Sequence, residues 1–517
     1  MTTSSDMQCV SHTSHNGTEV SREMRIEQTN EGAFDSTKHY APLSLGDVLV
    51  LGLGKSGKAA SSYCARLLGD RVSSLTVAAG SYTDAAHEYA QDLEARGATV
   101  LFDTYQFTRS YDLCIASPGI SQFSDFYRAA EAAATEVISE VEFAWRESAA
   151  DSTWVAITGT NGKTTTTALT AHVLQMCGLP AAAVGNIGDT CLDAVASGSV
   201  GCYVAEVSSY QLASTSRFRP QVAVLLNITP DHLKWHGSFE AYCEAKCKIY
   251  AQCGDQDTVI LDATNDVVRG YVKELRVQRP EDRGFSYIPL GSAQGLDVSM
   301  VEACGADQAA YLDGDALMVV YQGATYTVGT LDELLIKGEH NASNALAAAS
   351  AALALGCDAE TIRAGLTSFQ PLEHRIEPCG SIRGVRCYND SKATNVDATL
   401  KALAAFGSDR PIVLLGGDDK GTDLTELVQQ ACAHCKAVVC FGAAGPRFYE
   451  AFEQASLPHV RATHLEHALD TALDQASSGD IVILSPACAS FDEFSCFEER
   501  GEVFKRLVAQ RSTERGA

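Results

Sequence analysis

The stretch Thr158-Gly-Thr-Asn-Gly-Lys-Thr-Thr-Thr166 decides how the middle of this chain folds. It follows the apolar run Trp154–Ile157, which is typical of a buried parallel strand, and it leads into a helical pattern. Its two glycines allow backbone N–H groups to curl around a phosphate, while Lys163 can reach β- and γ-phosphate oxygens and Thr164 can place a hydroxyl on Mg²⁺. Only two residues separate the glycines, fewer than in the usual Walker motif. Because an ordinary strand–helix turn rarely combines Gly, Lys and Thr at a helix start, we predict a site for a nucleoside triphosphate.

A second glycine-rich loop, Gly52-x-Gly54-x-x-Gly57, lies between the apolar run Asp47–Leu51 and a helical stretch. This context is typical of a turn that binds phosphate at a helix N-terminus. A dinucleotide-binding fold also needs an acidic residue at the end of its second strand, whereas the run Leu75–Ala79 is followed by glycine. We therefore disfavour NAD and FAD and predict that the loop binds another diphosphate. A purely structural tight turn is the alternative.

The rest of the chain alternates short apolar runs with helical stretches, which predicts an α/β fold with mostly parallel sheets. The length of 517 residues suggests three or so domains. We predict units at residues 43–149, 150–370 and 371–517. Residues 1–42 are polar and lack an apolar period, so we predict a disordered tail there.

Two polar residues follow strands beside the phosphate loop. Glu206 ends the run Gly201–Glu206, and a carboxylate at that place is expected to bind Mg²⁺. His232 closes the polar cluster Asn227–His232. It is a metal ligand, a substrate contact or a structural histidine.

Lys246 lies on the apolar stripe of a helix that we predict from Ser238 to Tyr250, whereas Lys248 faces outward. Burial disfavours an ammonium, and a neutral amine could react with CO₂ to give a metal-binding carbamate. The alternative is a lysine stem that lies along the apolar face with its head in solvent.

The third unit carries cationic residues at predicted strand ends. Arg375 opens the unit, Lys392 lies in the segment Asn389–Asn395, and Lys420 ends Gly416–Lys420. A further polar segment, Ser485–Phe494, follows another predicted strand. Ligands bind at the carboxyl ends of strands in open α/β sheets, so we predict anion binding here.

Acidic residues outnumber basic ones by 65 to 39, and the net charge is −26. A field of that sign repels nucleic acid and anionic membranes, so we expect neither as a partner. No apolar run reaches the ~18 residues that span a membrane, and the N-terminus lacks the core of a signal peptide. Together with 18 scattered cysteines, this predicts a reducing cytoplasm. We interpret the one Cys-x-x-Cys pair, Cys432 and Cys435, as structural, with a metal or redox role as the alternative.

These motifs resemble those of the Mur ligases of bacterial cell-wall synthesis. The marks are the phosphate loop, Gly185-Asn-Ile-Gly188, Asn227–His232 and Gly338-Glu-His-Asn341. Asn389–Asn395 and Ser485–Ser490 look like the branch of the family that adds D-glutamate. The resemblance covers about residues 43–510. The tail is extra to the family pattern, and alanines stand where the family often carries a charged contact to uracil.

The resemblance implies a Rossmann-like UDP-binding domain, a central P-loop ATPase and a Rossmann-like C-terminal domain. It implies a monomeric enzyme that uses ATP and two Mg²⁺ ions to join D-glutamate to UDP-N-acetylmuramoyl-L-alanine through an acyl phosphate. Lys163, His232 and Lys246 are the implied catalytic residues. The rival interpretations are a sibling ligase for another amino acid, a P-loop kinase or motor, and a non-catalytic nucleotide-binding module.

The resemblance also assigns ligands to individual residues. Those implied to bind ATP are Gly159, Thr160, Asn161, Gly162, Lys163, Thr164, Thr165, Asn344, Arg375 and Asp390. Those implied to bind the UDP-sugar are Ser56, Ser117, Gly119, Asn186 and Ser208. Those implied to bind D-glutamate are Lys392, Thr394, Lys420, Ser490 and Phe497. The implied metal ligands are Thr164, Glu206, His232 and Lys246, the last as a carbamate.

Overall fold

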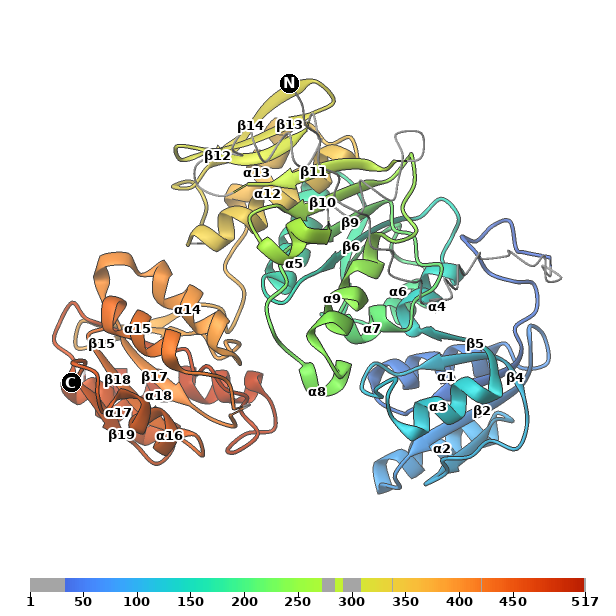
Figure 1. Ribbon diagram of the computed structural model, residues 1–517, viewed down its shortest axis with the longest axis horizontal. Helices are drawn as coiled ribbons and strands as arrows, with labels where there is room; N and C mark the ends of the chain where they lie inside the picture. Colours follow the sequence, from blue (N-terminus) through green and yellow to red (C-terminus); the bar gives the residue numbers. More distant parts are fainter. Residues whose placement is uncertain (1–32, 272–283, 292–307, 337, 420, 516–517) are drawn as a thin grey trace, which may run out of the picture.

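The computed structural model describes residues 33–271, 284–291, 308–336, 338–419 and 421–515. Three sheets follow one another along the chain, and each forms the centre of a separate unit (Figure 1). The predicted α/β fold with three sheet-bearing regions is therefore confirmed. The exact unit boundaries at residues 150 and 371 stay predictions.

The first unit is a five-stranded parallel sheet with the order β3-β2-β1-β4-β5. Val48 and Val50 of the first strand pack into one apolar cluster, whereas Leu49 packs into the cluster on the other face. The strand is apolar from Val48 to Leu51 because these side chains alternate between two buried faces. The strands are β1 (Gly46–Leu51), β2 (Val72–Gly80), β3 (Thr99–Phe102), β4 (Tyr111–Ala116) and β5 (Ala134–Ser139). The helices are α1 (Lys55–Arg66), α2 (Asp84–Ala95), α3 (Asp125–Ala133) and α4 (Glu140–Glu147).

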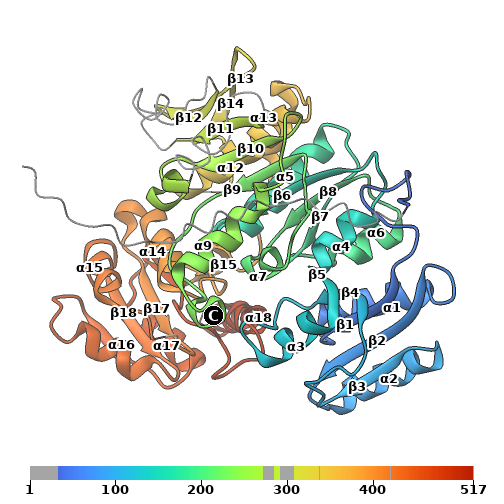
Figure 2. The ribbon, with the colours of Figure 1, turned by 45° about the vertical axis from the view of Figure 1, so that its right-hand side comes forward.

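The central unit holds a nine-stranded sheet with the order β14-β13-β12-β11-β10-β9-β6-β8-β7. It is parallel from β7 to β12, and β13 and β14 add an antiparallel edge. Figure 2 shows the long helices α5 and α12 beside this sheet. The strands are β6 (Thr153–Thr158), β7 (Ala181–Gly185), β8 (Cys202–Glu206), β9 (Val222–Leu225), β10 (Thr258–Asp262), β11 (Ser286–Leu290), β12 (Ala309–Asp313), β13 (Ala316–Tyr321) and β14 (Ala324–Thr330). The helices are α5 (Lys163–Met176), α6 (Cys191–Ser197), α7 (Ser209–Ala213), α8 (Leu233–His236), α9 (Phe239–Cys247), the 3₁₀ turn η1 (Lys248–Tyr250), α12 (Glu339–Ala354) and α13 (Ala359–Ser368).

The third unit is a six-stranded sheet with the order β15-β16-β20-β17-β18-β19, in which β15 is antiparallel to its neighbour. Its strands are β15 (Glu377–Ile382), β16 (Val385–Asn389), β17 (Ile412–Gly416), β18 (Ala437–Phe441), β19 (His459–Arg461) and β20 (Ile481–Leu484). Its helices are α14 (Val396–Ala405), the 3₁₀ turn η3 (Gly407–Asp409), α15 (Thr425–His434), α16 (Gly445–Phe452), α17 (Leu465–Gln475) and α18 (Phe497–Arg515). The predicted strands therefore end where the polar segments begin.

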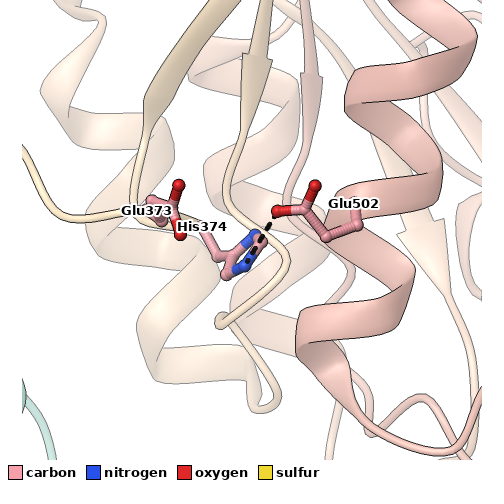
Figure 3. Close-up of side chains that lie close together, drawn as sticks. All are labelled: Glu373, His374 and Glu502. Atoms are coloured by element: carbon pink, nitrogen blue, oxygen red, sulfur yellow. Dashed lines mark ion pairs between the residues drawn. The ribbon is translucent and has the colours of Figure 1, made fainter.

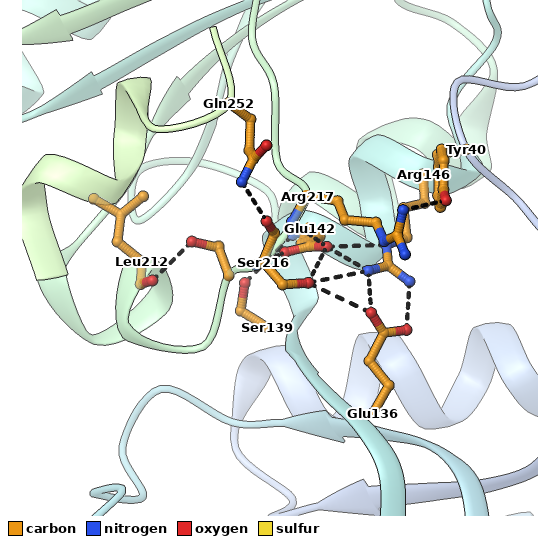
Figure 4. A network of polar contacts seen from close by, with 10 residues as sticks. Tyr40, Glu136, Ser139, Glu142, Arg146, Leu212, Ser216, Arg217 and Gln252 are labelled. Atoms are coloured by element: carbon orange, nitrogen blue, oxygen red, sulfur yellow. Dashed lines mark hydrogen bonds and ion pairs between the residues drawn. The ribbon is translucent and has the colours of Figure 1, made fainter. Parts of the chain in front are cut away.

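A buried polar network joins the first unit to the central one. Arg146 of α4 contacts Glu136 and Glu142, and Glu142 accepts a hydrogen bond from the backbone N–H of Arg217 at 3.0 Å (Figure 4). Arg217 in turn contacts the Tyr40 hydroxyl and lies over its ring. Because the network satisfies buried charges, it fixes α4 against the central unit.

The predicted tail needs a correction. Residues 1–32 lie outside the described residues, but residues 33–42 are ordered and pack at the same junction. His39 donates its backbone N–H to the Ser148 carbonyl at 3.1 Å, and the Thr37 carbonyl accepts from Ala150 at 2.9 Å. Lys38 pairs with Glu147, whose carboxylate is fully buried. Polar composition did not reveal this packing, because most of these bonds are made by backbone groups.

Candidate active site

The phosphate loop connects β6 to α5 with the strained backbone that only glycine adopts easily. Gly162 has φ 86°, and a Cβ there would lie 2.7 Å from Asn344 Oδ1. No side chain caps α5, so the first N–H groups of this helix are available to a ligand at the phosphate loop. The Lys163 ammonium donates to the carbonyls of Gly159 and Thr160, both at 2.9 Å. Lys163 is thus held at the loop by two backbone carbonyls.

A cavity of about 330 Å³ opens beside this loop, between the central and third units. The central unit contributes Asn161, Gly162 and Thr165 from the loop and Asn344 from α12. The third unit contributes Arg375 and Asp390. The two units also touch directly, since Asn161 donates to the Asp397 carboxylate. Six of the residues that resemblance assigns to ATP therefore line one cavity.

Glu206 ends β8 beside the loop and is 2% exposed. Its Oε1 accepts from Asn186 Nδ2 at 2.9 Å, whereas its Oε2 is buried without a hydrogen-bond partner. Burial lowers the pKa of Lys163, and the nearby Glu206 carboxylate opposes that shift. A buried carboxylate oxygen without a hydrogen-bond partner costs free energy, and a bound cation would remove that cost. Glu206 Oε2 is therefore suited to bind a cation.

Lys246 lies inside the protein and not along its surface. It is 2% exposed, its Nζ donates to the Gly159 carbonyl at 2.7 Å, and it lies 4.7 Å from the centroid of the Tyr242 ring. Burial and the neighbouring Lys163 charge hold its pKa well below the usual range. The interpretation with the head in solvent is therefore wrong. The expectation that Lys248 faces outward is also wrong, because its ammonium contacts the Ala213 carbonyl in a half-buried place.

His232 lies at the start of α8 with a left-handed backbone, φ 55°. Its ring is 4.9 Å from the Tyr210 ring, and its Nε2 is 3.5 Å from Asp231 Oδ2. The side chain is 38% exposed, so it is accessible to a ligand. Thr164, in the first turn of α5, is buried. The roles of both side chains stay predictions.

A second cavity, of about 570 Å³, lies between the first and central units. Ser56, Ser117 and Gly119 line it from the first unit and Asn186 from the central unit. A Cβ at Gly57 would lie 2.0 Å from the Gly52 carbonyl oxygen, so this glycine permits α1 to approach β1. Ser208 does not line the cavity. Ser208 caps α7 and donates its hydroxyl to Gln211, and Gln211 lines the cavity.

Four of the residues assigned to D-glutamate gather in the third unit. The Lys392 ammonium lies 4.9 Å from the centroid of the Phe497 ring, and Thr394 follows it, its N–H bonded to the Lys392 carbonyl at 2.8 Å. Ser490 is buried. Burial and the nearby Arg375 charge lower the pKa of Lys392 to about 8. Lys420 lies outside the described residues.

Arg500 of α18 is a residue that the sequence analysis missed. Its guanidinium is fully buried and donates to Ser391 Oγ at 2.9 Å, the Ser391 carbonyl at 2.8 Å, the Cys488 carbonyl at 3.1 Å and the Ala489 carbonyl at 3.0 Å. These acceptors belong to the two loops that carry Lys392 and Ser490. One arginine thus joins both loops, and the signal in the sequence is its place three residues after Phe497, at helical spacing.

A histidine and two glutamates also come together near Arg375. Figure 3 shows Glu373, His374 and Glu502, with His374 Nε2 3.8 Å from Glu502 Oε1. Lys505 already pairs with both carboxylates, at 3.5 and 2.7 Å, so an ammonium of the protein lies at this cluster. In the described part of the chain, Cys432 and Cys435 belong to no such group.

Comparison with known proteins agrees with this arrangement. The Mur ligase middle domain matches residues 157–352, and the Mur ligase glutamate ligase domain matches residues 374–488. A UDP-N-acetylmuramoylalanine–D-glutamate ligase of Thermoanaerobacter pseudethanolicus is 35% identical over 470 residues, which are 90% of this chain and 98% of the relative. The chain belongs to the Mur ligase family. Another ligase of the same name, from Acidobacterium capsulatum, is 38% identical over a stretch that covers 89% of this chain and 95% of the relative.

Two solved structures share the fold of this Mur ligase. A UDP-N-acetylmuramate-alanine ligase from Thermotoga maritima has a TM-score of 0.52 at 18% identity and covers 90% of this chain and 99% of its own. A pseudomurein peptide ligase type C from Methanothermus fervidus has a TM-score of 0.53 at 17% identity and covers the same shares. Among the described residues no helix is both long and apolar enough to cross a bilayer.

Proposed function

We propose that this Mur ligase adds D-glutamate to UDP-N-acetylmuramoyl-L-alanine in peptidoglycan precursor synthesis, at the expense of ATP. The observation that carries the proposal is the meeting of the central and third units at the phosphate loop. Both units line the cavity beside this loop, and Asn161 of the loop donates to the carboxylate of Asp397, two residues after the segment Asn389–Asn395. This geometry supports a reaction in which the third unit brings the amino acid to the phosphate loop. The names of relatives that are 35–38% identical support D-glutamate as the amino acid.

The proposed reaction has two steps. An oxygen of the alanyl carboxylate attacks the γ-phosphorus of ATP, which gives an acyl phosphate and ADP. The amine of D-glutamate attacks the acyl carbon, loses a proton, and phosphate leaves with its electron pair as the amide forms. Phosphoryl transfer depends on positioning and charge neutralisation, which Lys163 and the N–H groups of α5 would provide.

We assign the ligands along the two cavities. Asn344, Arg375 and Asp390 would hold the nucleotide, because they line the cavity beside the phosphate loop. Burial raises the pKa of Asp390 to about 7, and Ser485 donates to it at 2.7 Å, so this carboxyl is fixed in place. The loops joined by Arg500 would hold D-glutamate, with Lys392, Thr394, Ser490 and Phe497 in contact. Lys420, which lies outside the described residues, stays a predicted contact. Ser56, Ser117, Gly119 and Asn186 would hold the UDP-sugar, and Ser208 would orient Gln211.

The unpartnered Glu206 Oε2 supports one Mg²⁺ ion beside the phosphate loop, and we infer a second ion from the family resemblance. Thr164 and Glu206 would hold one ion, and His232 and Lys246 the other. Bound Mg²⁺ would neutralise phosphate charge during transfer. Lys246 would contribute as a carbamate, in which its Nζ bonds to the carbon of CO₂ and releases a proton. The buried position of Lys246 supports this role, because burial disfavours the charged ammonium. The Nζ atom donates to the Gly159 carbonyl, so it lies at the phosphate loop.

A direct assay tests the proposal. ADP and phosphate release are measured with ATP, Mg²⁺ and UDP-N-acetylmuramoyl-L-alanine, adding D-glutamate, L-glutamate, L-lysine or diaminopimelate in turn. We expect release with D-glutamate alone. Turnover with another amino acid and none with D-glutamate would establish a sibling ligase, and ATP hydrolysis that ignores the amino acid would establish a simple NTPase. Lys392→Gln should raise the KM for D-glutamate, whereas Lys436→Gln, a surface control in the same unit, should not.

A further inference from the structure

The cavity between the first and central units is lined by two chemically different groups of residues. One group lies at the start of α1, where Gly54 leaves open space and the helix begins at Lys55 without a side-chain cap or an acid in its first turn. The other group, Ala79, Gly80 and Tyr105, is uncharged. Among the described residues that line the cavity, Lys55 alone is charged. The start of α1 suits a diphosphate, and the uncharged group suits a part of the ligand without charge.

Tyr105 presents an uncovered aromatic ring among the uncharged lining residues. It is 52% exposed, and its packing partner Phe126 holds it through an edge contact with ring centroids 5.4 Å apart and planes at 75°. Phe126 is 9% exposed and stacks at 6.4 Å on Phe107, which meets Tyr111 edge-on. The ring is therefore held by a rigid aromatic cluster while much of its surface is open to the cavity.

The walls beside Tyr105 provide hydrogen-bonding groups without charge. The end of β2, Ala79 and Gly80, and the adjacent Ser81 line the cavity together with Ile120. Their backbone groups can bond to the edge of a planar ring whose face lies on an aromatic side chain. A neutral pyrimidine matches these walls, since it has a flat face to stack and carbonyl and N–H groups on its edge.

We propose that Tyr105 is the stacking platform for the uracil ring of the UDP-sugar and determines the preference of this site for a uridine ligand. The inference rests on the proposed function, because it takes the diphosphate to lie over α1 and the nucleoside to extend toward β2. It explains how the base is bound although Ala78 and Ala79 end β2 without a charged side chain.

The test uses the full chain and titrations with UDP, which need no turnover. Tyr105→Ala should weaken UDP binding by about 5- to 100-fold, the range found when a base loses its aromatic partner. Tyr105→Phe keeps the ring and should restore the affinity. The matched control is Tyr82→Ala, because Tyr82 is 51% exposed in the same unit, packs on Phe102 at 5.4 Å and lies outside the cavity lining.

Turnover provides the second readout. Tyr105→Ala should raise the KM for UDP-N-acetylmuramoyl-L-alanine by a similar factor and leave the KM values for ATP and D-glutamate unchanged. Unchanged UDP affinity in a folded Tyr105→Ala protein would overturn the inference, as would an equal loss in Tyr105→Phe or in Tyr82→Ala. Failure of the wild-type protein to use D-glutamate would refute the proposed function instead, and the UDP titrations would still decide the role of Tyr105.

Discussion

Replacing Arg500 by methionine should loosen the proposed D-glutamate site and destabilise the third unit. The change keeps a long side chain but removes the donors to Ser391, Cys488 and Ala489, whose acceptor atoms lie 2.8–3.1 Å from the guanidinium. Each buried acceptor left without a donor costs about 1–3 kcal/mol of stability. Removing the buried guanidinium charge also removes its desolvation penalty, which offsets part of this loss. We therefore expect the free energy of unfolding to fall by about 3–5 kcal/mol, as when other buried charged networks are broken.

The assays are thermal unfolding and steady-state kinetics. For a unit of this size, the loss corresponds to a Tm lower by about 6–20 °C. Because Lys392 and Ser490 would lose their common anchor, kcat/KM for D-glutamate should fall by about 100-fold while the KM for ATP changes little. Arg506→Met is the control, since Arg506 is exposed on the same helix. A variant at Arg500 with wild-type Tm and wild-type KM for D-glutamate would refute the reasoning.

The other predictions concern Lys246, Glu206 and Glu140. Lys246→Ala should lose activity and regain part of it with added short carboxylic acids, which could replace the carbamate; an active variant would reject the role. Glu206→Gln should lower kcat by at least about 100-fold and raise the Mg²⁺ concentration needed for half-maximal rate, and an unchanged Mg²⁺ dependence would exclude Glu206 as a ligand. Burial raises the pKa of Glu140 from its ordinary 4.5 to about 7, so the protonated form is favoured in the folded state. The contribution of Glu140 to stability should be fully present below pH 4.5 and be lost, by about 3 kcal/mol, as pH rises through 7. Glu140→Gln, which keeps an acceptor for the Leu192 N–H now 2.6 Å away, should flatten this dependence in denaturant titrations, and an equal slope in both proteins would contradict it.

Local sequence patterns predicted the features that depend on neighbouring residues. The phosphate loop was readable because a strand, two glycines and a helix start follow one another within a few residues. The inward side of Lys246 followed from helical periodicity, since Tyr242 and Ile249 lie on the same stripe. That periodicity could not decide where the ammonium ends, because its acceptor, the Gly159 carbonyl, lies 87 residues away.

Features made by distant segments were not predictable in the same way. Arg500 meets Ser391 across 109 residues, and no local pattern marks such a pair. Residues 33–42 looked disordered because their side chains are polar, yet their backbone groups bond to the segment around Ser148. Ser208 and Gln211 are close in sequence, but only the fold shows that Gln211 reaches the cavity and Ser208 supports it.

The central claim is that an acyl phosphate of the alanyl carboxylate precedes the amide with D-glutamate. UDP-N-acetylmuramoyl-L-alanine labelled with ¹⁸O in both carboxylate oxygens tests it most directly, with products analysed by mass spectrometry. The account predicts that one labelled oxygen leaves in the released phosphate, and that the other stays in a product enlarged by one D-glutamyl residue. Phosphate without ¹⁸O, or a UDP-sugar that does not gain glutamate, would contradict it.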